Sequence, residues 1–408
     1  MDILIEEEDG RILVAALKDG RIEGLEMEPP HEEVRWGSIY WAKVTAIDAA
    51  LDAAFLDLDG FNTGILYNNE TRSFDKEGRV VKGGAKAIGK RFNAGDMVAV
   101  QAKSAYIPKD HDDFASTETK TPQMSMDITL PGRYIIYCPM MGVNRVSTRI
   151  RDKKMRKQLL KMQDELEDID GCILRLAAAN TQTDVLMREG KILQNAWQEM
   201  QKFMAGHEAG LIALGPDAIQ RTMSDQAAQP IDRIEIVTME HFEEVEEWCA
   251  VFAPDLVTKI LPIQLPNAEE ELALFHERDI IGQIEDLFQS YCVLPSGGSV
   301  ILQKTAALTA VDVNKGSDKA SKLGTNIEAA KEVARQLRLR NCGGIIMIDF
   351  LKMNSKKEEG KLIAALEEAI NDDPCTVQIH GITNLGLIEV TRKRRTPPLG
   401  ERFVGRFE

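Results

Sequence analysis

Residues 299–350 decide the fold of the C-terminal part of the chain, and they read SVILQKTAALTAVDVNKGSDKASKLGTNIEAAKEVARQLRLRNCGGIIMIDF. The β-branched and apolar runs at 299–305 and 307–313 predict two strands. The run at 344–350 is short and apolar, which is typical of a strand buried on both faces. Three strands are therefore expected within about 50 residues, a density that fits an α/β unit.

A helix is predicted between the last two of these strands, because residues 328–340 carry apolar side chains at helical spacing. The segment 325–328 has the form of a capping box that would open this helix. The pair Gly343-Gly344 is suited to ending it. A strand–helix–strand crossover normally joins parallel strands with a right-handed turn, so the two strands are expected to be parallel.

Two aspartates, Asp312 and Asp349, stand near the ends of these two strands. If the strands are neighbours, their backbones lie about 4.8 Å apart, and both carboxylates would project at the carboxyl edge where such sheets bind ligands. Two carboxylates without a nearby His suit Mg²⁺. Asn314 lies two residues after Asp312 on the same strand face and could orient both carboxylates. A strand-end aspartate is also a common helix cap or turn residue, so the pattern alone leaves that alternative open.

Length and composition indicate a water-soluble globular protein. The 408 residues allow two to four domains, and 44% are hydrophobic and 28% charged. No apolar run approaches the roughly 18–20 residues of a membrane span, and the acidic N-terminus lacks the pattern of a signal peptide. The six cysteines form no CxxC pair, which fits a reducing compartment. We therefore expect a cytoplasmic protein without a membrane partner.

The net charge of −15 at first argues against a nucleic-acid partner, because phosphate binding depends on Lys and Arg. The charge is segregated, however. Residues 145–161 contain eight basic residues and one acid, and residues 392–395 form a second basic cluster. Local basic patches on an acidic body are compatible with RNA binding. The segment 145–161 could equally be a solvated helix face.

The rest of the chain divides by pattern. Residues 1–30 predict a hairpin with turns at Asp9-Gly10 and Asp19-Gly20. Four or five short strands after Gly37 predict a small closed barrel of the OB type. Residues 109–122 are polar and aperiodic, which predicts a loop. Helical periodicity dominates 150–204 and returns in 241–254 and 268–292.

Several motifs resemble one known family. The runs LPSGGSVILQKTAALTAVDVN (294–314), TNIEAAKEVARQLRLRNCGGIIMIDF (325–350) and LGLIEVTRKR (385–394) closely resemble the catalytic half of bacterial ribonuclease E/G. The runs SIYWAKVTAID and DAAFLDLDG resemble its OB-fold RNA-binding domain. The resemblance implies an α/β multidomain fold: an RNase H-like scaffold interrupted by an OB-fold barrel and a 5′-sensor subdomain, followed by a DNase-like α/β catalytic unit. The implied boundaries are 1–35 and 219–290 for the two segments of the RNase H-like scaffold, 36–128 for the OB-fold domain, 129–218 for the 5′-sensor-like subdomain, and 291–408 for the DNase-like unit.

The resemblance also implies an activity, the Mg²⁺-dependent cleavage of single-stranded RNA to 5′-phosphate and 3′-hydroxyl products. It implies that Asp312 and Asp349 bind the metal and that Asn314 supports them. Other residues are implied to contact RNA, and they are Phe55, Lys120, Tyr67, Arg175, Gly132 and Ile136. For Phe55, a place in the barrel core is the alternative. Tyr67 enters because Ile65 replaces an aromatic of the family on the same strand face.

The sequence departs from the family at its 5′-monophosphate pocket. Arg175 is retained there, but Leu176 replaces a threonine and Thr376 stands where a second arginine is expected. We therefore expect weak recognition of a 5′-monophosphate, because a single Arg holds it. The loop after Asp312 is also shorter than in the family. The chain ends near the expected start of a CPxC zinc-sharing segment, so a homodimer would have to form without the zinc link.

Two interpretations of different class follow from the sequence. The first is a metal-dependent endoribonuclease, which the clustered Asp312, Asn314 and Asp349 favour. The second is a non-catalytic RNA-binding or scaffold protein of the same fold, which the altered sensor and shorter loop favour. A nucleotide-binding α/β domain is disfavoured because neither GxxxxGK[ST] nor GxGxxG occurs.

Overall fold

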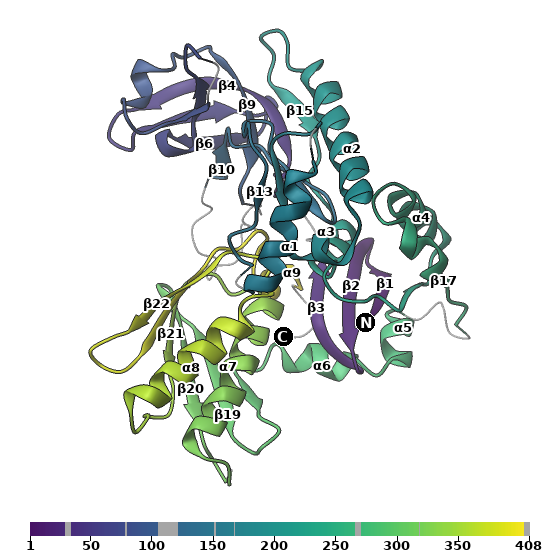
Figure 1. The fold of residues 1–408 in the computed structure, drawn as a ribbon, viewed down its shortest axis with the longest axis vertical. Coiled ribbons are helices and arrows are strands. Elements are labelled where there is room, and N and C mark those ends of the chain that lie inside the picture. The colour runs from purple at the N-terminus through teal and green to yellow at the C-terminus, as the bar shows by residue number, and fades with distance from the viewer. Residues whose placement is uncertain are drawn as a thin grey trace. The chain divides into compact units, whose positions relative to one another are not determined.

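The chain forms two compact units of mixed α/β structure in this computed structural model (Figure 1). One unit consists of residues 30–262 with Met1, and the other of residues 2–29 with 263–408. The structure describes residues 1–28, 34–77, 80–104, 121–150, 152–166, 168–265, 271–317 and 319–403. Among these, no helix is both long and apolar enough to cross a membrane.

A closed five-stranded barrel dominates the first part of the first unit. Its strands are β4 (Ile39–Asp48), β5 (Ala53–Asp57), β6 (Thr63–Tyr67), β10 (Gln123–Ser125) and β9 (Met97–Ala102), in that order around the barrel. Pairing of β9 with β4 closes it, and a register shift between Val44 and Ala46 bends β4. Gly64 leaves room for the Met124 side chain, which would have to shift because a Cβ atom at this position would lie 2.6 Å from its Cγ. The barrel is consistent with the OB-like domain that the sequence predicts.

Smaller elements complete the first unit. A hairpin and an added edge strand accompany the barrel: β7 (Arg72–Phe74), β8 (Val80–Lys82) and β15 (Gly210–Ala213). A four-stranded sheet has the order β11 (Leu130–Pro131), β12 (Ile135–Tyr137), β14 (Cys172–Leu174), β13 (Arg145–Val146). The remaining elements are α1 (Lys153–Asp164), α2 (Thr183–Gln201), α3 (Ala218–Asp225), β16 (Arg233–Ile236), α4 (Met239–Phe252) and β17 (Ile260–Pro262). Helices α1 and α2 bury Leu159, Leu186 and Leu193 against the four-stranded sheet in one core.

The second unit begins with a three-stranded meander. It consists of β1 (Asp2–Glu8), β2 (Arg11–Lys18) and β3 (Arg21–Met27). Asp9-Gly10 and Asp19-Gly20 form its turns, and all four residues have positive φ, as two-residue hairpin turns of the primed type require. The predicted hairpin and both of its turns are confirmed.

A six-stranded sheet carries the rest of the second unit. Its order is β18 (Tyr291–Val293), β19 (Ser299–Lys304), β20 (Leu308–Asn314), β21 (Gly344–Asp349), β23 (Ile388–Arg392) and β22 (Val377–Ile382). The helices are α5 (Ala273–Glu277), α6 (Ile281–Asp286), α7 (Lys322–Leu339), α8 (Lys356–Ala369) and α9 (Leu399–Arg402). Helices α7 and α8 lie side by side over one face of this sheet (Figure 1). Val311, Val313 and Ile348 face them and are buried against Val333 and Leu337.

The opposite face of this sheet is open, so the prediction that residues 344–350 form a strand buried on both faces was wrong. Only alternate residues of β21, Ile346 and Ile348, are buried, while Ile345 is 45% exposed. Helices cover only one side of this strand. Part of its apolar run therefore lies on the open face and not in the core. This open face is what makes the strand ends accessible.

The predicted start of the crossover helix was wrong by about one turn, whereas its predicted end at residue 340 lies within one residue of the observed end at Leu339. Helix α7 begins at Lys322, where the Ser321 hydroxyl accepts a hydrogen bond from the Gly324 amide at 3.0 Å. Thr325, the predicted cap, is fully buried inside the helix. At the other end Asn341 adopts the left-handed conformation (φ 50°) and stops the helix before the glycine pair.

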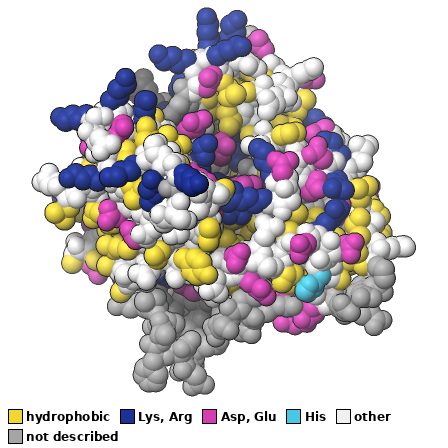
Figure 2. Space-filling model, turned by 90° about the horizontal axis from the view of Figure 1, so that it is seen from below, with side chains coloured by type: hydrophobic (Ala, Val, Ile, Leu, Met, Phe, Trp, Pro, Cys, Tyr) yellow, Lys and Arg dark blue, Asp and Glu magenta, His cyan; other side chains and the backbone are white. Residues whose placement is uncertain are grey.

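The described face in Figure 2 shows Lys and Arg side chains in groups, one of them at the top of the view, with Asp and Glu side chains between them. This fits the segregated charge seen in the sequence.

A buried ion pair lies beside the second unit's sheet, between Arg392 on β23 and Asp373, at 2.8 Å. The Arg392 guanidinium also donates to the Asn341 side chain and to the Cys342 carbonyl, both at 2.9 Å. Arg392 therefore joins β23 to the segment that enters β21.

We expect Arg392→Met to lower the free energy of unfolding by about 3–5 kcal/mol, because Asp373 would be left as an uncompensated buried charge. Urea denaturation measures the change. The double variant Arg392→Met/Asp373→Leu should recover most of the loss, since it removes both charges. Lys202→Met, which breaks an exposed pair with Glu199, serves as the control. An Arg392→Met protein as stable as the wild type would contradict this assignment.

Candidate metal centre

The two predicted aspartates lie directly beside each other in the sheet. Strands β20 and β21 pair in parallel, and their register places Asp312 opposite Asp349 at the carboxyl ends of both strands. Helix α7 makes the connection between them. The predicted parallel arrangement is confirmed, and the two Cα positions are separated by one interstrand spacing, about 4.8 Å.

Side-chain alternation directs both carboxylates to the open face. Val311 and Val313 are buried on the helix side, so Asp312 between them points away from it and is exposed. Asp349 follows the buried Ile348 and is exposed in the same way. The Asn314 side-chain amide donates to Oδ2 of Asp312 at 2.7 Å. The structure thus brings together the three residues that the sequence proposed for this site.

An open pocket of about 260 Å³ surrounds the pair. Its lining consists of Ile301, Gln303, Ala310, Val311, Asp312, Met347, Asp349 and Leu387. Most of these eight residues are apolar, and only the two aspartates among them carry a charge. An apolar wall limits screening by water, so the attraction of a cation to the carboxylates is stronger than at a bare surface.

The donor set fits a hard divalent cation that keeps part of its water shell. In the described part of the chain, neither carboxylate forms an ion pair with Lys or Arg. No group of three or more His, Cys, Asp or Glu residues there could enclose a metal. A closed zinc site, which needs four protein ligands, is therefore not supported by these residues. Two carboxylates and a neighbouring amide suit Mg²⁺ with several waters.

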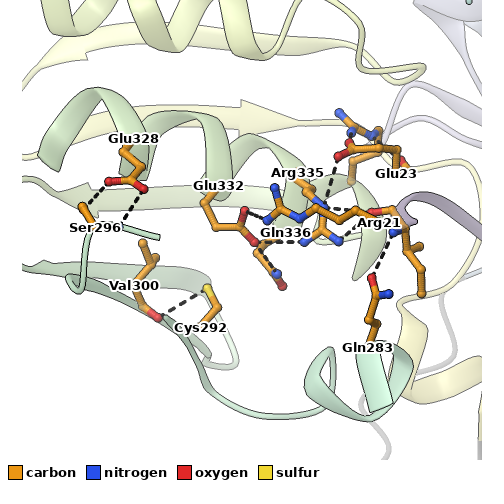
Figure 3. A network of polar contacts seen from close by, with 12 residues as sticks. Arg21, Glu23, Gln283, Cys292, Ser296, Val300, Glu328, Glu332, Arg335 and Gln336 are labelled. Carbon is orange, nitrogen blue, oxygen red and sulfur yellow. Dashed lines mark hydrogen bonds and ion pairs between the residues drawn. The ribbon is translucent and has the colours of Figure 1, made fainter. Parts of the chain in front are cut away.

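A polar network fixes the crossover helix that sets this geometry (Figure 3). On α7, Glu332 forms an ion pair with Arg21 of β3 and a second one with Arg335 at 3.0 Å. The Arg335 guanidinium donates to the Ile22 carbonyl at 2.8 Å. Burial is the largest influence on the Arg335 guanidinium, and it lowers the pKa of this group. The ARQLRLR motif, which carries part of the family resemblance, thus ties α7 to the N-terminal meander.

On the barrel, Phe55 and Tyr67 share the outer face. Phe55 pairs with Ile65 across β5 and β6, and Ala53 pairs with Tyr67. The barrel core contains Leu56 and Leu66 but not Phe55, which is half-buried. The alternative place for Phe55, in the barrel core, is therefore wrong. Lys120, the other proposed RNA contact of this domain, lies outside the described residues.

The residues that the sequence analysis expects to form a 5′ sensor are partly brought together, but their polar groups are engaged within the protein. The Arg175 guanidinium donates to the carbonyls of Gly132 and Ser224, both at 2.8 Å. The Gly132 amide donates to the Ile135 carbonyl at 2.9 Å. Ile136 lies on β12, paired with Ile173. Leu176 packs at the edge of the apolar core.

Glu189 on α2 contacts the loop that begins at Gly132, a contact that the sequence analysis missed. Its carboxylate accepts hydrogen bonds from the amides of Arg133, Tyr134 and Ile135 at 2.6 to 3.0 Å. Glu189 is only 4% exposed, and burial raises its pKa although the three amides act in the opposite direction. A Cβ atom at Gly132 would lie 2.7 Å from its carboxyl carbon. Nothing in the sequence links these residues, because they are 54–56 positions apart.

Fold and site together define an α/β protein with a closed barrel and a paired-carboxylate site suited to a divalent cation. The chain belongs to the ribonuclease E/G family, whose model matches residues 129–395. It is 30% identical to ribonuclease E of Haemophilus influenzae over 98% of this chain and 42% of that protein. It is 32% identical to ribonuclease E of Escherichia coli K12 over 98% of this chain and 37% of that protein. Ribonuclease G of Salmonella typhimurium is 28% identical over 96% of this chain and 80% of its own length.

We expect Glu189→Gln to lower the free energy of unfolding by about 1–3 kcal/mol, because its new amide group would oppose a buried backbone donor. Thermal or urea unfolding detects this change. Glu199→Gln, at an exposed position of the same helix, should leave stability nearly unchanged. Equal stabilities of the two variants would show that the three amides do not depend on the Glu189 carboxylate.

Proposed function

We propose that the chain is a Mg²⁺-dependent endoribonuclease that cleaves single-stranded RNA and leaves 5′-phosphate and 3′-hydroxyl ends. One observation carries the proposal: Asp312 and Asp349 lie in register on an open sheet face, with no ion-pair partner among the described residues. Family membership supports RNA as the substrate, since relatives are named ribonuclease E and ribonuclease G. The chain spans 42% of the Haemophilus relative, so the activity is proposed for this chain on its own residues.

Each residue of the proposed site has its own role in the reaction. Asp312 and Asp349 would hold Mg²⁺ through carboxylate oxygens, and the Asn314 amide fixes the rotamer of Asp312. When bound, the ion polarises the phosphodiester and lowers the pKa of a bound water. Attack of water on phosphorus breaks the bond to the 3′ oxygen, which takes up a proton. The water oxygen stays on the 5′-phosphate product.

We propose that Phe55 and Tyr67 bind substrate by stacking on RNA bases, which contributes about 1–3 kcal/mol per base. Their place on the outer barrel face supports this, since neither belongs to the barrel core. We propose the domain layout that the family resemblance implies, with boundaries after residues 35, 128, 218 and 290. A homodimer and a cytoplasmic site of action remain predictions.

We further propose that recognition of the RNA 5′ end is weak. Arg175 already donates to two backbone carbonyls, and the Glu189 carboxylate places a negative group against the loop that begins at Gly132. A 5′-monophosphate would therefore compete with internal hydrogen bonds and meet like charge. Leu176 offers no hydroxyl group to compensate.

Cleavage of a labelled single-stranded RNA with Mg²⁺ tests the main proposal. We expect activity of the wild type, a loss of about a hundredfold or more for Asp349→Asn, and retained RNA binding, because only the metal contact changes. Asn314→Ala should give a smaller loss. Asp372→Asn makes the same charge change at an exposed position after α8 and should cleave normally. RNA binding without cleavage by the wild type under varied divalent metals would favour a non-catalytic RNA-binding or scaffold protein.

For the 5′ end, we expect equal cleavage rates for RNAs that carry a 5′-monophosphate or a 5′-hydroxyl. The physical reason is that Arg175 and the Gly132 amide are already hydrogen bonded. Single-turnover rates on the two RNAs, otherwise identical in sequence, provide the measurement. A strong preference for the monophosphorylated RNA would overturn this aspect of the proposal.

A further inference from the structure

Four exposed lysines lie on helix α1, and none of them has a role in the proposed metal chemistry. They are Lys153, Lys154, Lys157 and Lys161. Over the described ranges, none of the four has a hydrogen bond or ion pair with an acidic side chain. Asp152, the one acid beside them, caps the helix by accepting a hydrogen bond from the Met155 amide. We call these residues the α1 lysine row.

The fold fixes the direction in which this row points. Leu159 and Met162 anchor the opposite side of α1 in the core of the four-stranded sheet. Lys153, Lys157 and Lys161 recur every four residues, so they lie on one side of the helix, roughly 6 Å apart along its axis. The helix cannot rotate them away from solvent without exposing its buried residues.

The isolation of this row is unusual within so acidic a chain. Lysines at such spacing repel each other, and the net charge of −15 leaves many acids that could have neutralised them. Helix α8 shows the ordinary arrangement, because Lys357 and Lys361 are interleaved there with Glu358 and Glu359. On α1, no acid stands between Lys153 and Lys161.

We propose that the α1 lysine row is a docking surface for the sugar–phosphate backbone of RNA, independent of base sequence. This inference rests on the proposed function, which makes RNA the substrate. A protein partner fits less well, since interfaces depend on aromatic and other large anchors, and Leu160 is the only apolar residue of α1 that is exposed. A lipid surface fits less well too, because membrane-bound helices insert an apolar face and that of α1 is buried.

Salt-dependent RNA binding tests this proposal. The host is Asp349→Asn, which we expect to bind RNA without cleaving it, and the probe is a fluorescein-labelled, unstructured single-stranded RNA followed by anisotropy. The test variant adds Lys153→Gln, Lys154→Gln, Lys157→Gln and Lys161→Gln. The control adds Lys331→Gln, Lys356→Gln, Lys357→Gln and Lys361→Gln, four exposed lysines of α7 and α8 that give the same charge change.

Each phosphate contact contributes about 0.7 to the slope of log K against log salt for single strands. Loss of four contacts should therefore lower the slope by about 2.8, and the host should lose about 50-fold more affinity than the test variant between roughly 50 and 200 mM salt. The control should keep the slope of the host. Unchanged melting temperatures would show that all variants are folded.

Three outcomes would overturn the proposal. The test variant could keep the slope of the host, or the control could lose as much as the test variant. Alternatively, binding to phosphatidylserine vesicles could fall in the test variant while the slope for RNA stayed the same. A host that binds no RNA, together with a wild type that cleaves none, would refute the proposed function as well. A host that binds RNA and a wild type that cleaves it would confine the failure to the lysine row.

Discussion

The parallel pairing of β20 with β21 is the constraint on which the site depends. In a strand the side chains alternate, so a slip of one residue would turn Asp312 toward the helices and bury its charge. The register is held because Val311 and Ile348 are buried under α7. Core packing on one face of the sheet therefore determines which groups stand on the other. The position of the carboxylates follows from the hydrophobic core.

Helix α7 has to be held in turn, and polar contacts do this. Glu332 and Arg335 connect the helix to Arg21 and Ile22 of β3, far away in the sequence. Such networks are costly to bury, and they stabilise only when each group finds a partner. Here the guanidinium of Arg335 is paired with both a carboxylate and a carbonyl. The N-terminal meander therefore supports the candidate metal centre, although it contributes none of the residues proposed to hold the ion.

Much of this could be predicted from the sequence where local pattern controls structure. The strands, the crossover helix and the pairing of the two aspartates follow from periodicity and chain topology. The start of α7 could not, because Ser321 and Thr325 both offer capping side chains and tertiary packing buries the second. The open face of β21 depends on which elements cover the sheet. Glu189 could not be found either, since its partners are distant in sequence.

The two candidate sites differ in how far the protein satisfies its own polar groups. Around Arg175 the donors and acceptors are completed internally, by carbonyls and by the Glu189 carboxylate. A ligand arriving there must replace bonds that already exist, and it gains only the difference. At the candidate metal centre two carboxylates stand side by side, where like charges disfavour each other, and the Asn314 amide donates a hydrogen bond to Asp312. A divalent cation there would replace water and remove a repulsion, so binding has a clear source of free energy. The polar groups around Arg175 therefore gain little from a ligand, whereas Asp312 and Asp349 are arranged to gain from a cation.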